Sequence, residues 1–143
     1  MDQGKHWALM TNHRGASAVE FALIAPVFLL LVLGALCYGI YFGAAHSIQQ
    51  LAADAARAAV AGLDGDERTA LVSAFVANNA SAYPFIDPEK LTLDAVPSPA
   101  DPDQFLVRLA YDASNLPIWN IYPPVPLPGP VITFTSTIRN GGV

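Results

Sequence analysis

Residues 21–45 read FALIAPVFLLLVLGALCYGIYFGAA, twenty-five positions without one charged side chain. A helix of this length reaches about 37 Å at ~1.5 Å per residue, which is enough to cross a hydrocarbon layer of ~30 Å with some tilt. Burying it in a soluble protein would take a large core, and a chain of 143 residues has room for only one modest domain beside it. We therefore predict a single membrane-spanning helix that anchors a small C-terminal domain to a bilayer.

A cleaved secretory signal is the main alternative for this stretch. Such a signal has an apolar region of only ~7–15 residues, followed at once by small residues at the cleavage site. Here the apolar run is longer and continues into more helix, although Gly43-Ala44-Ala45 gives a weak match to a signal-peptidase site. The membrane anchor is the preferred interpretation, and the cleaved signal stays open.

Charge predicts the orientation of the span. Lys5 and Arg14 precede it against Asp2, whereas nine acidic and four basic residues follow residue 63. The positive-inside rule then puts the N-terminus in the cytoplasm and the domain outside. An acidic outer domain argues against nucleic acid as a partner. Cys37, the one cysteine, lies inside the span and is interpreted as a small hydrophobic residue.

The helix is expected to extend beyond the membrane-spanning segment. Ser17-Ala18-Val19-Glu20 fits a capping box, so the helix can begin there, and Pro26 should kink or loosen it. Beyond residue 45, six apolar residues recur at helical spacing: Ile48, Leu51, Ala52, Ala55, Ala59 and Leu63. We predict a cytoplasmic leader over 1–15, a transmembrane helix that continues as an amphipathic helix over 16–63, and an outer domain over 64–143.

The domain should have an α+β fold. A second helix is expected from about residue 66 to residue 79, with Leu71 and Phe75 facing inward and Val72 and Val76 as further candidates. Three stretches alternate with strand period, over 90–96, 104–112 and 131–139. A proline-rich turn over 97–102 should join the first two as a hairpin, and a rigid loop over 115–130 should lead to the third. We expect a three-stranded antiparallel sheet against the upper part of the long helix.

Catalytic motifs are missing from the sequence. His6, His13 and His46 lack metal-ligand spacing, and there is no P-loop, nucleophile elbow or dinucleotide fingerprint. Asp101 and its acidic neighbours are read as a solvated loop and not as a calcium site. The sequence therefore predicts neither an enzyme nor a cofactor.

Residues 13–21, HRGASAVEF, place a basic residue and a glycine before the span and then a lone carboxylate, Glu20. A carboxylate in a membrane helix costs ~2.5–3.5 kcal/mol at mid-bilayer and less toward the edge, so it usually has a partner. The alternative is that Glu20 closes the capping box at a helix N-terminus. The residue alone leaves both interpretations open.

Together these residues resemble a prepilin-peptidase site of the type IV pilin superfamily. The run RGASAVEFALIAPVFLLLVLG is similar to the opening of TadE-like pseudopilins of the tight-adherence (Flp) pilus, and QQLAADAARAAVAG is similar to that family's alanine-rich segment. The resemblance implies cleavage between Gly15 and Ala16, and assembly roles for Glu20 and the adjacent Phe21. In such a pilin the Glu20 carboxylate would pair with the new amino group of Ala16 on a neighbouring subunit.

The resemblance further implies a minor pseudopilin of the bacterial inner membrane, with a periplasmic domain and possible incorporation in a pilus. Its partners would be a prepilin peptidase, other pilin-like subunits and the lipid bilayer. Cys37-Tyr38-Gly39 and Gly141 depart from the family pattern and leave the TadE, TadF or TadG-like subtype open. The alternative is an uncleaved, membrane-anchored binding module that would use the loop around Trp119 and Tyr122.

Ala35, Gly39 and Gly43 recur every four residues inside the span. Small residues at this spacing let helices approach closely in lipid, so we predict a helix-packing face. The alternative is that glycine is simply common in membrane helices.

Overall fold

The computed structural model describes residues 13–121 and 125–139, without the side chains of residues 13, 14 and 16. Most of the expected leader therefore lies outside the described residues, as do Tyr122 and Gly141. The chain divides into two compact units, residues 1–35 and 36–143, which are treated separately below.

One helix, α1, runs over His13–Ala59 with Pro26 inside it. It begins four residues before Ser17, so Ser17 is not its N-cap; no proline between residues 13 and 17 prevents the earlier start. It also ends before Leu63, which is 90% exposed and does not belong to the buried stripe. α1 is the one helix in the described part of the chain that is long and apolar enough to cross a membrane.

The first unit contains the apolar N-terminal part of α1. Its large side chains are exposed over residues 19–32, among them Phe21 at 73%, Leu23 at 70% and Leu31 at 68%. Exposure of so continuous an apolar surface to water is unfavourable, whereas its contact with lipid or with other apolar helices is favourable. The structure thus agrees with a single-pass membrane anchor.

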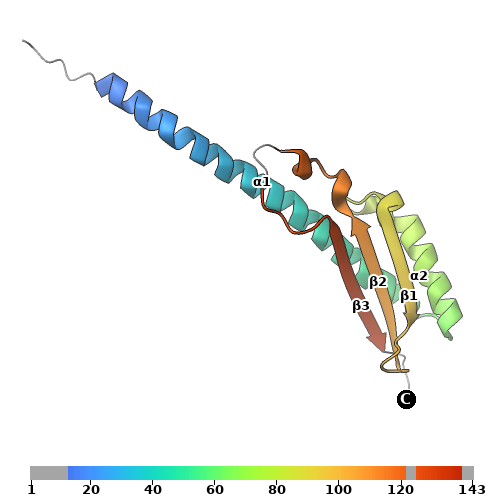
Figure 1. Cartoon of the computed structure of the whole chain (residues 1–143). Helices are drawn as coiled ribbons and strands as arrows, with labels where there is room; N and C mark the ends of the chain where they lie inside the picture. The colour runs from blue at the N-terminus through green and yellow to red at the C-terminus, as the bar shows by residue number, and fades with distance from the viewer. Residues whose placement is uncertain (1–12, 122–124, 140–143) are drawn as a thin grey trace, which may run out of the picture. The chain divides into compact units, whose positions relative to one another are not determined.

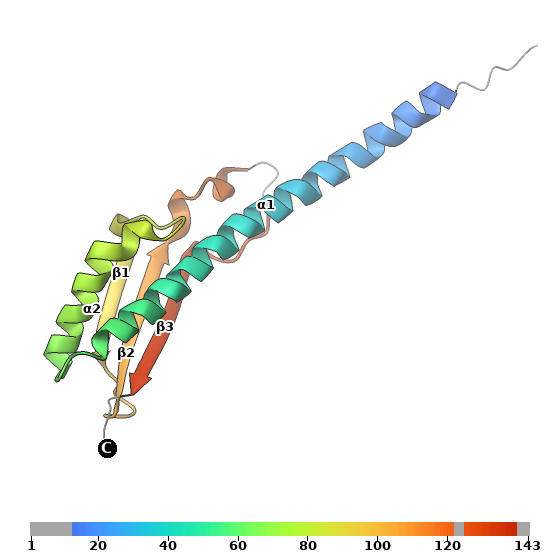
Figure 2. The same cartoon turned by 180° about the vertical axis from the view of Figure 1, so that it is seen from behind.

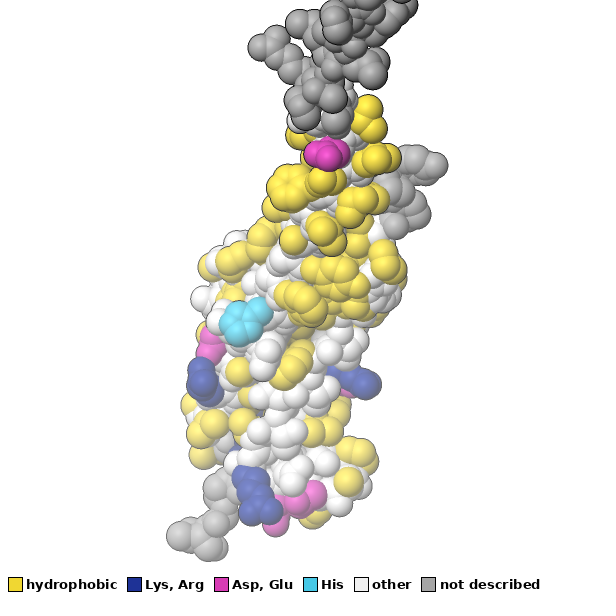
Figure 3. Space-filling model, turned by 90° about the vertical axis from the view of Figure 1, so that its left-hand side faces the viewer, with side chains coloured by type: hydrophobic (Ala, Val, Ile, Leu, Met, Phe, Trp, Pro, Cys, Tyr) yellow, Lys and Arg dark blue, Asp and Glu magenta, His cyan; other side chains and the backbone are white. Residues whose placement is uncertain are grey.

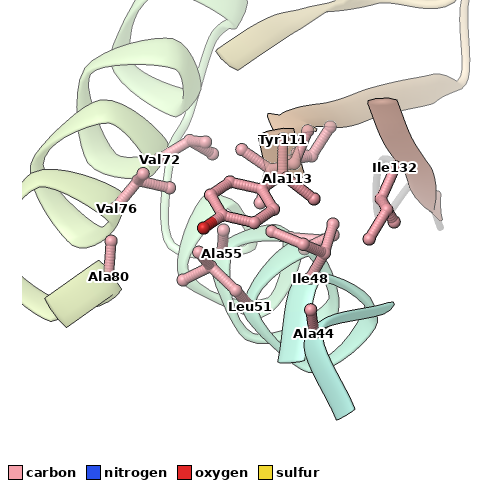
Figure 4. Close-up of a cluster of buried hydrophobic side chains, with 14 of the residues drawn as sticks. Ala44, Ile48, Leu51, Ala55, Val72, Val76, Ala80, Tyr111, Ala113 and Ile132 are labelled. Carbon is pink, nitrogen blue, oxygen red and sulfur yellow. The ribbon is translucent and has the colours of Figure 1, made fainter. Parts of the chain in front are cut away.

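The second unit begins with the remainder of α1, which buries one face. That face consists mostly of small side chains: Cys37, Tyr41, Ala44, Ser47, Ile48, Leu51, Ala52, Ala55, Ala56 and Ala59. Because alanines project little, the sheet can pack closely on this face. Figure 4 shows Ala44, Ile48, Leu51 and Ala55 directed at Tyr111 in the centre of the core. The predicted amphipathic upper half of the helix is confirmed, and Cys37 is buried with a free thiol.

Helix α2 covers Gly65–Asn79. The Asp64 carboxylate accepts a hydrogen bond from the Glu67 backbone N–H at 2.8 Å, and the Glu67 carboxylate accepts one from the Leu63 N–H at 2.8 Å. These bonds satisfy amide groups that lack partners at a helix start. Val72 and Val76 form its buried face.

The inward face of α2 agrees in part with the sequence prediction. Val72 and Val76 are buried, and Phe75 is partly buried and packs against the core. Leu71, which was also expected to face inward, is only partly buried.

Three strands form one antiparallel sheet in the order β1-β2-β3, namely Leu91–Pro97, Gln104–Asp112 and Val131–Arg139. Helices α1 and α2 lie on the same face of it, as the two views show (Figures 1 and 2). The alternate residues Phe105, Val107, Leu109 and Tyr111 of the central strand are buried beneath them. The expected α+β fold is confirmed, and the strands agree with the sequence prediction to within one residue at each end.

Short 3-10 turns shape the connections. They are η1 at Ala80–Ala82, η2 at Pro88–Lys90, η3 at Ala113–Asn115 and η4 at Pro117–Asn120. In the β1–β2 turn the Asp101 carboxylate accepts hydrogen bonds from the Asp103 N–H at 3.0 Å and the Gln104 amide at 2.9 Å. Asp101 therefore has a structural role in this hairpin.

Candidate functional site

The start of α1 contains the residues expected to be cut and to assemble. Gly15 and Ala16 both lie in the first turn of α1, and Gly15 is exposed. Glu20 and Phe21 are exposed on the next turn. Glycine is a poorer helix former than alanine, and the first turn of a helix has fewer backbone hydrogen bonds to lose than the interior.

The surroundings of Glu20 bear on whether its carboxylate caps the helix or pairs with a group on another chain. As the eighth residue of α1, Glu20 lies beyond the first turn, where a capping box or the helix dipole would act. Its exposed neighbours Val19, Phe21 and Leu23 are apolar. Among the described residues its carboxylate has no hydrogen-bond or ion-pair partner. The geometry therefore favours a partner supplied by another chain over a local cap.

The small residues of the predicted packing face have different surroundings. Ala35 and Gly39 are exposed, and a methyl group on Gly39 would meet nothing within 4 Å. A methyl group on Gly43 would lie 2.8 Å from Cε2 of Phe85, in this same chain. Gly43 is thus already covered by Phe85 of the domain. Of the three residues in the predicted helix-packing face, Ala35 and Gly39 are accessible to another helix.

Phe85 was missed by the sequence analysis. It has a φ of 65°, in the left-handed region that side chains other than glycine rarely adopt. The Tyr111 hydroxyl donates to the Phe85 carbonyl at 2.9 Å, and the Asp87 N–H donates to the same hydroxyl at 3.4 Å. These bonds hold the turn so that the Phe85 ring lies on Gly43. The sequence contains a glycine on the helix and a Tyr-Pro-Phe turn, but neither pattern indicates that the two come into contact.

Trp119 is engaged within the domain. Its indole N–H donates to the Ala113 carbonyl at 2.6 Å, and its ring packs edge to face on Tyr41 with the centroids 6.4 Å apart. The side chain is half-buried. Its role as a free binding residue in the alternative function is therefore not favoured.

Residues 125–130, which we call the proline strap, lie against α1. The Tyr38 hydroxyl donates to the Pro126 carbonyl, and the Tyr41 hydroxyl is 3.5 Å from the Gly129 carbonyl. Tyr41 is nearly buried, at 9% exposure. The last part of the apolar stretch 21–45 is thus in contact with the domain's own chain, which the sequence did not indicate.

A second contact joins α1 to the turn after α2. The Tyr83 hydroxyl donates to the Asp54 carboxylate at 2.8 Å, and Arg57 bonds the other oxygen of that carboxylate. Burial, followed by the hydrogen bond to Asp54 and its negative charge, raises the pKa of Tyr83 to about 12. The phenol therefore stays protonated and keeps donating over the physiological range.

The described part of the domain has hollows on its surface. One of about 500 Å³ is lined by residues 81–87 with Asn115 and Leu116. Another, of about 600 Å³, lies between α1 and β3 and contains His46, whose ring is 3.0 Å from the Gln50 amide. Within the described ranges no three His, Cys, Asp or Glu side chains come together as metal ligands would.

Comparison with known proteins identifies one family. Residues 15–57 match the family model described as TadE-like protein. The match begins at Gly15 and covers the apolar stretch and the alanine-rich segment, so it confirms the resemblance and connects the chain with proteins of the tight-adherence pilus. No curated protein and no solved structure matches the chain.

Proposed function

We propose that this TadE-like chain is a minor pseudopilin, an assembly subunit of a tight-adherence (Flp-type) pilus or secretion system. A prepilin peptidase would cut it between Gly15 and Ala16 on the cytoplasmic face of the bacterial inner membrane. The family match over residues 15–57 supports the class of protein, and one helix able to cross a membrane supports single-pass anchoring. The proposed product is a structural subunit and not an enzyme.

The observation that carries the proposal is the exposed Glu20 carboxylate among apolar side chains. Cleavage would make Ala16 the first residue, and its new amino group would carry a positive charge. Pairing that charge with Glu20 of a neighbouring subunit buries both charges together, whereas Glu20 alone would be buried unpaired. Because the free amino group of Ala16 exists only after cleavage, this pairing requires cleavage to precede assembly.

Orientation follows from charge. Lys5 and Arg14 precede the span, and the residues after position 63 carry a balance of five negative charges. The positive-inside rule supports a cytoplasmic N-terminus and a periplasmic domain. The partners would be the peptidase, other pilin-like helices, which could approach over Ala35 and Gly39, and the bilayer.

The alternative is an uncleaved membrane-anchored binding module. It would need accessible aromatic side chains on the loop before β3. Trp119 instead bonds Ala113 and packs on Tyr41, and Tyr122 lies outside the described residues. The pseudopilin is therefore the better supported function.

Co-expression with a prepilin peptidase tests the proposal. A C-terminally tagged chain should lose residues 1–15 only when an active peptidase is present, and intact-mass measurement should find Ala16 at the N-terminus. Gly15→Leu should block the cut, because the larger side chain would not fit the peptidase. Gly39→Leu is the matched control, since it makes the same change further along α1 and should still be cut. An uncut wild-type chain would refute the pseudopilin assignment.

A further inference from the structure

The proline strap, residues 125–130, presents an apolar outer surface. Val125 and Leu127 are partly buried against the core, whereas Pro126, Pro128 and Pro130 are exposed. The side chains of the strap therefore alternate between the domain and its surroundings. The exposed half is made of proline rings.

Several backbone carbonyls of the strap already have hydrogen-bond partners within the domain. Its three prolines have no N–H to leave without a partner. The Pro126 carbonyl accepts from Tyr38, the Gly129 carbonyl faces the Tyr41 hydroxyl, and the Pro130 carbonyl accepts from the Ala113 N–H at 2.8 Å. A polar group costs little to bury once it is hydrogen-bonded, so these three carbonyls do not oppose removal of the strap from water.

The strap also belongs to a segment without charge. Residues 113–138 contain no Asp, Glu, Lys, Arg or His, and neither do residues 21–45 of α1. The tyrosine hydroxyl bonds hold these two charge-free segments together within the domain unit. Flanking residues that can carry a charge at neutral pH include His46 on the helix and Asp112, which is opposite Val131 in the sheet register. Figure 3 shows hydrophobic side chains gathered in the upper part of the view around one carboxylate, while the Lys and Arg side chains lie lower.

Helix length places this region at the edge of a bilayer. A hydrocarbon layer of ~30 Å takes about 20 helical residues, so a span that starts at Phe21 ends near Ile40. Around that point Leu36 and Phe42 are 58% and 59% exposed, and Tyr38, Tyr41 and Trp119 lie beside them. Aromatic side chains with polar tips are typical of the lipid–water interface.

We propose that the proline strap, with the exposed side chains of Leu36 and Phe42, lies in the headgroup region of the bilayer and gives the domain a second membrane contact. The occupant of this surface is lipid, because the strap contacts Tyr38 and Tyr41, where the span is expected to end, and the surface carries no charge. Binding depends on apolar and aromatic insertion and does not require anionic lipid. The contact rests only on α1 crossing the bilayer and not on peptidase processing.

A probe on the strap tests the contact. The full chain in a Cys37→Ala background receives one cysteine, Pro128→Cys on the strap or Ala100→Cys on the β1–β2 turn, each labelled with an environment-sensitive fluorophore. Both positions are exposed, but register places them at opposite ends of the sheet. Each chain is reconstituted into phosphatidylcholine vesicles with and without bromine on the acyl chains near the headgroup.

The strap probe should emit at shorter wavelength than the turn probe, show several-fold weaker quenching by iodide and be quenched by brominated lipid. The Ala100→Cys probe should be open to iodide and insensitive to bromine. Equal iodide quenching at the two positions would overturn the proposal. Protection from iodide without quenching by brominated lipid would also overturn it, because it would show another protein chain on the strap. Carbonate extraction of the vesicles checks α1 insertion separately, so loss of anchoring is distinguished from loss of the strap contact.

Discussion

Gly62 is the position where one methyl group should cost most. It follows the end of α1 and is buried. A methyl group there would lie 2.6 Å from Cγ, 2.8 Å from the backbone nitrogen and 3.1 Å from Cα of Arg68. Two of these atoms belong to the backbone of α2, so a side-chain rotation cannot relieve the overlap. Either α2 must shift or the turn after α1 must open.

The expected cost of Gly62→Ala follows from that geometry. Forcing extra volume into a packed site costs about 1–3 kcal/mol. In a domain of this size each 1 kcal/mol lowers the midpoint of unfolding by about 4–8 °C, so a fall of roughly 4–24 °C is expected. The flexibility that alanine removes from the unfolded chain offsets less than about 1 kcal/mol of this.

Gly65→Ala is the matched control. Its methyl group would lie 3.4 Å from Pro97 Cγ, an ordinary contact, at the first residue of α2. Alanine is the better helix former, so this variant should be neutral or slightly stabilised.

Thermal unfolding of both full chains in detergent micelles measures the difference. The fluorescence of Trp119 in a Trp7→Phe background reports on the domain alone, because the indole packs on Tyr41 inside it. If Gly62→Ala unfolds within about 2 °C of Gly65→Ala, a shift below the cost expected for one overpacked contact, the reasoning about close approach is wrong.

Three further predictions concern function and stability. Glu20→Gln should be cleaved like the wild type but assemble poorly. Intact-mass analysis measures the cleavage and pilus recovery measures the assembly. Normal assembly of this variant would mean that Glu20 acts only as a helix cap. Tyr111→Phe should lower the free energy of unfolding by about 1–2 kcal/mol in urea, because its buried hydroxyl bonds the Phe85 carbonyl; an unchanged midpoint would mean that this bond is not needed to hold the turn. The pKa of Tyr83 is about 12 in the folded chain against an ordinary value of 10.0, so the protonated phenol stabilises the fold below pH 10 and this stabilisation is lost as pH rises toward 12. Tyr83→Phe should flatten the dependence of stability on pH in that window, and absorbance at 295 nm should show one fewer late-titrating phenol than in the wild type.

Much of the secondary structure could be predicted from local patterns. The strand-period alternation over 104–112 predicted β2, and the structure shows that Phe105, Val107 and Leu109 form its buried face. Helix ends were less predictable. Ser17 had the right chemistry for a cap, but a cap is used only where the chain leaves the helix, and here the helix continues back to His13.

The cleavage and assembly residues Gly15, Ala16 and Glu20 remain a prediction from one short motif, and the family match begins at the first of them. The contacts of Gly43 with Phe85 and of Tyr38 with Pro126 join residues 42 and 88 positions apart, and no local pattern encodes such pairs.

The apolar stretch 21–45 by itself indicated a helix able to cross a membrane, because twenty-five residues without charge are long enough to span a bilayer. Only the tertiary structure decided that the end of this stretch is shared with the domain. Cys37, Tyr41 and Ala44 are buried there, whereas Phe21 and Leu31 remain exposed. Hydrophobicity measures the cost of contact with water and is the same for a side chain that meets lipid and one that meets protein. Which of the two it meets depends on where the rest of the chain folds.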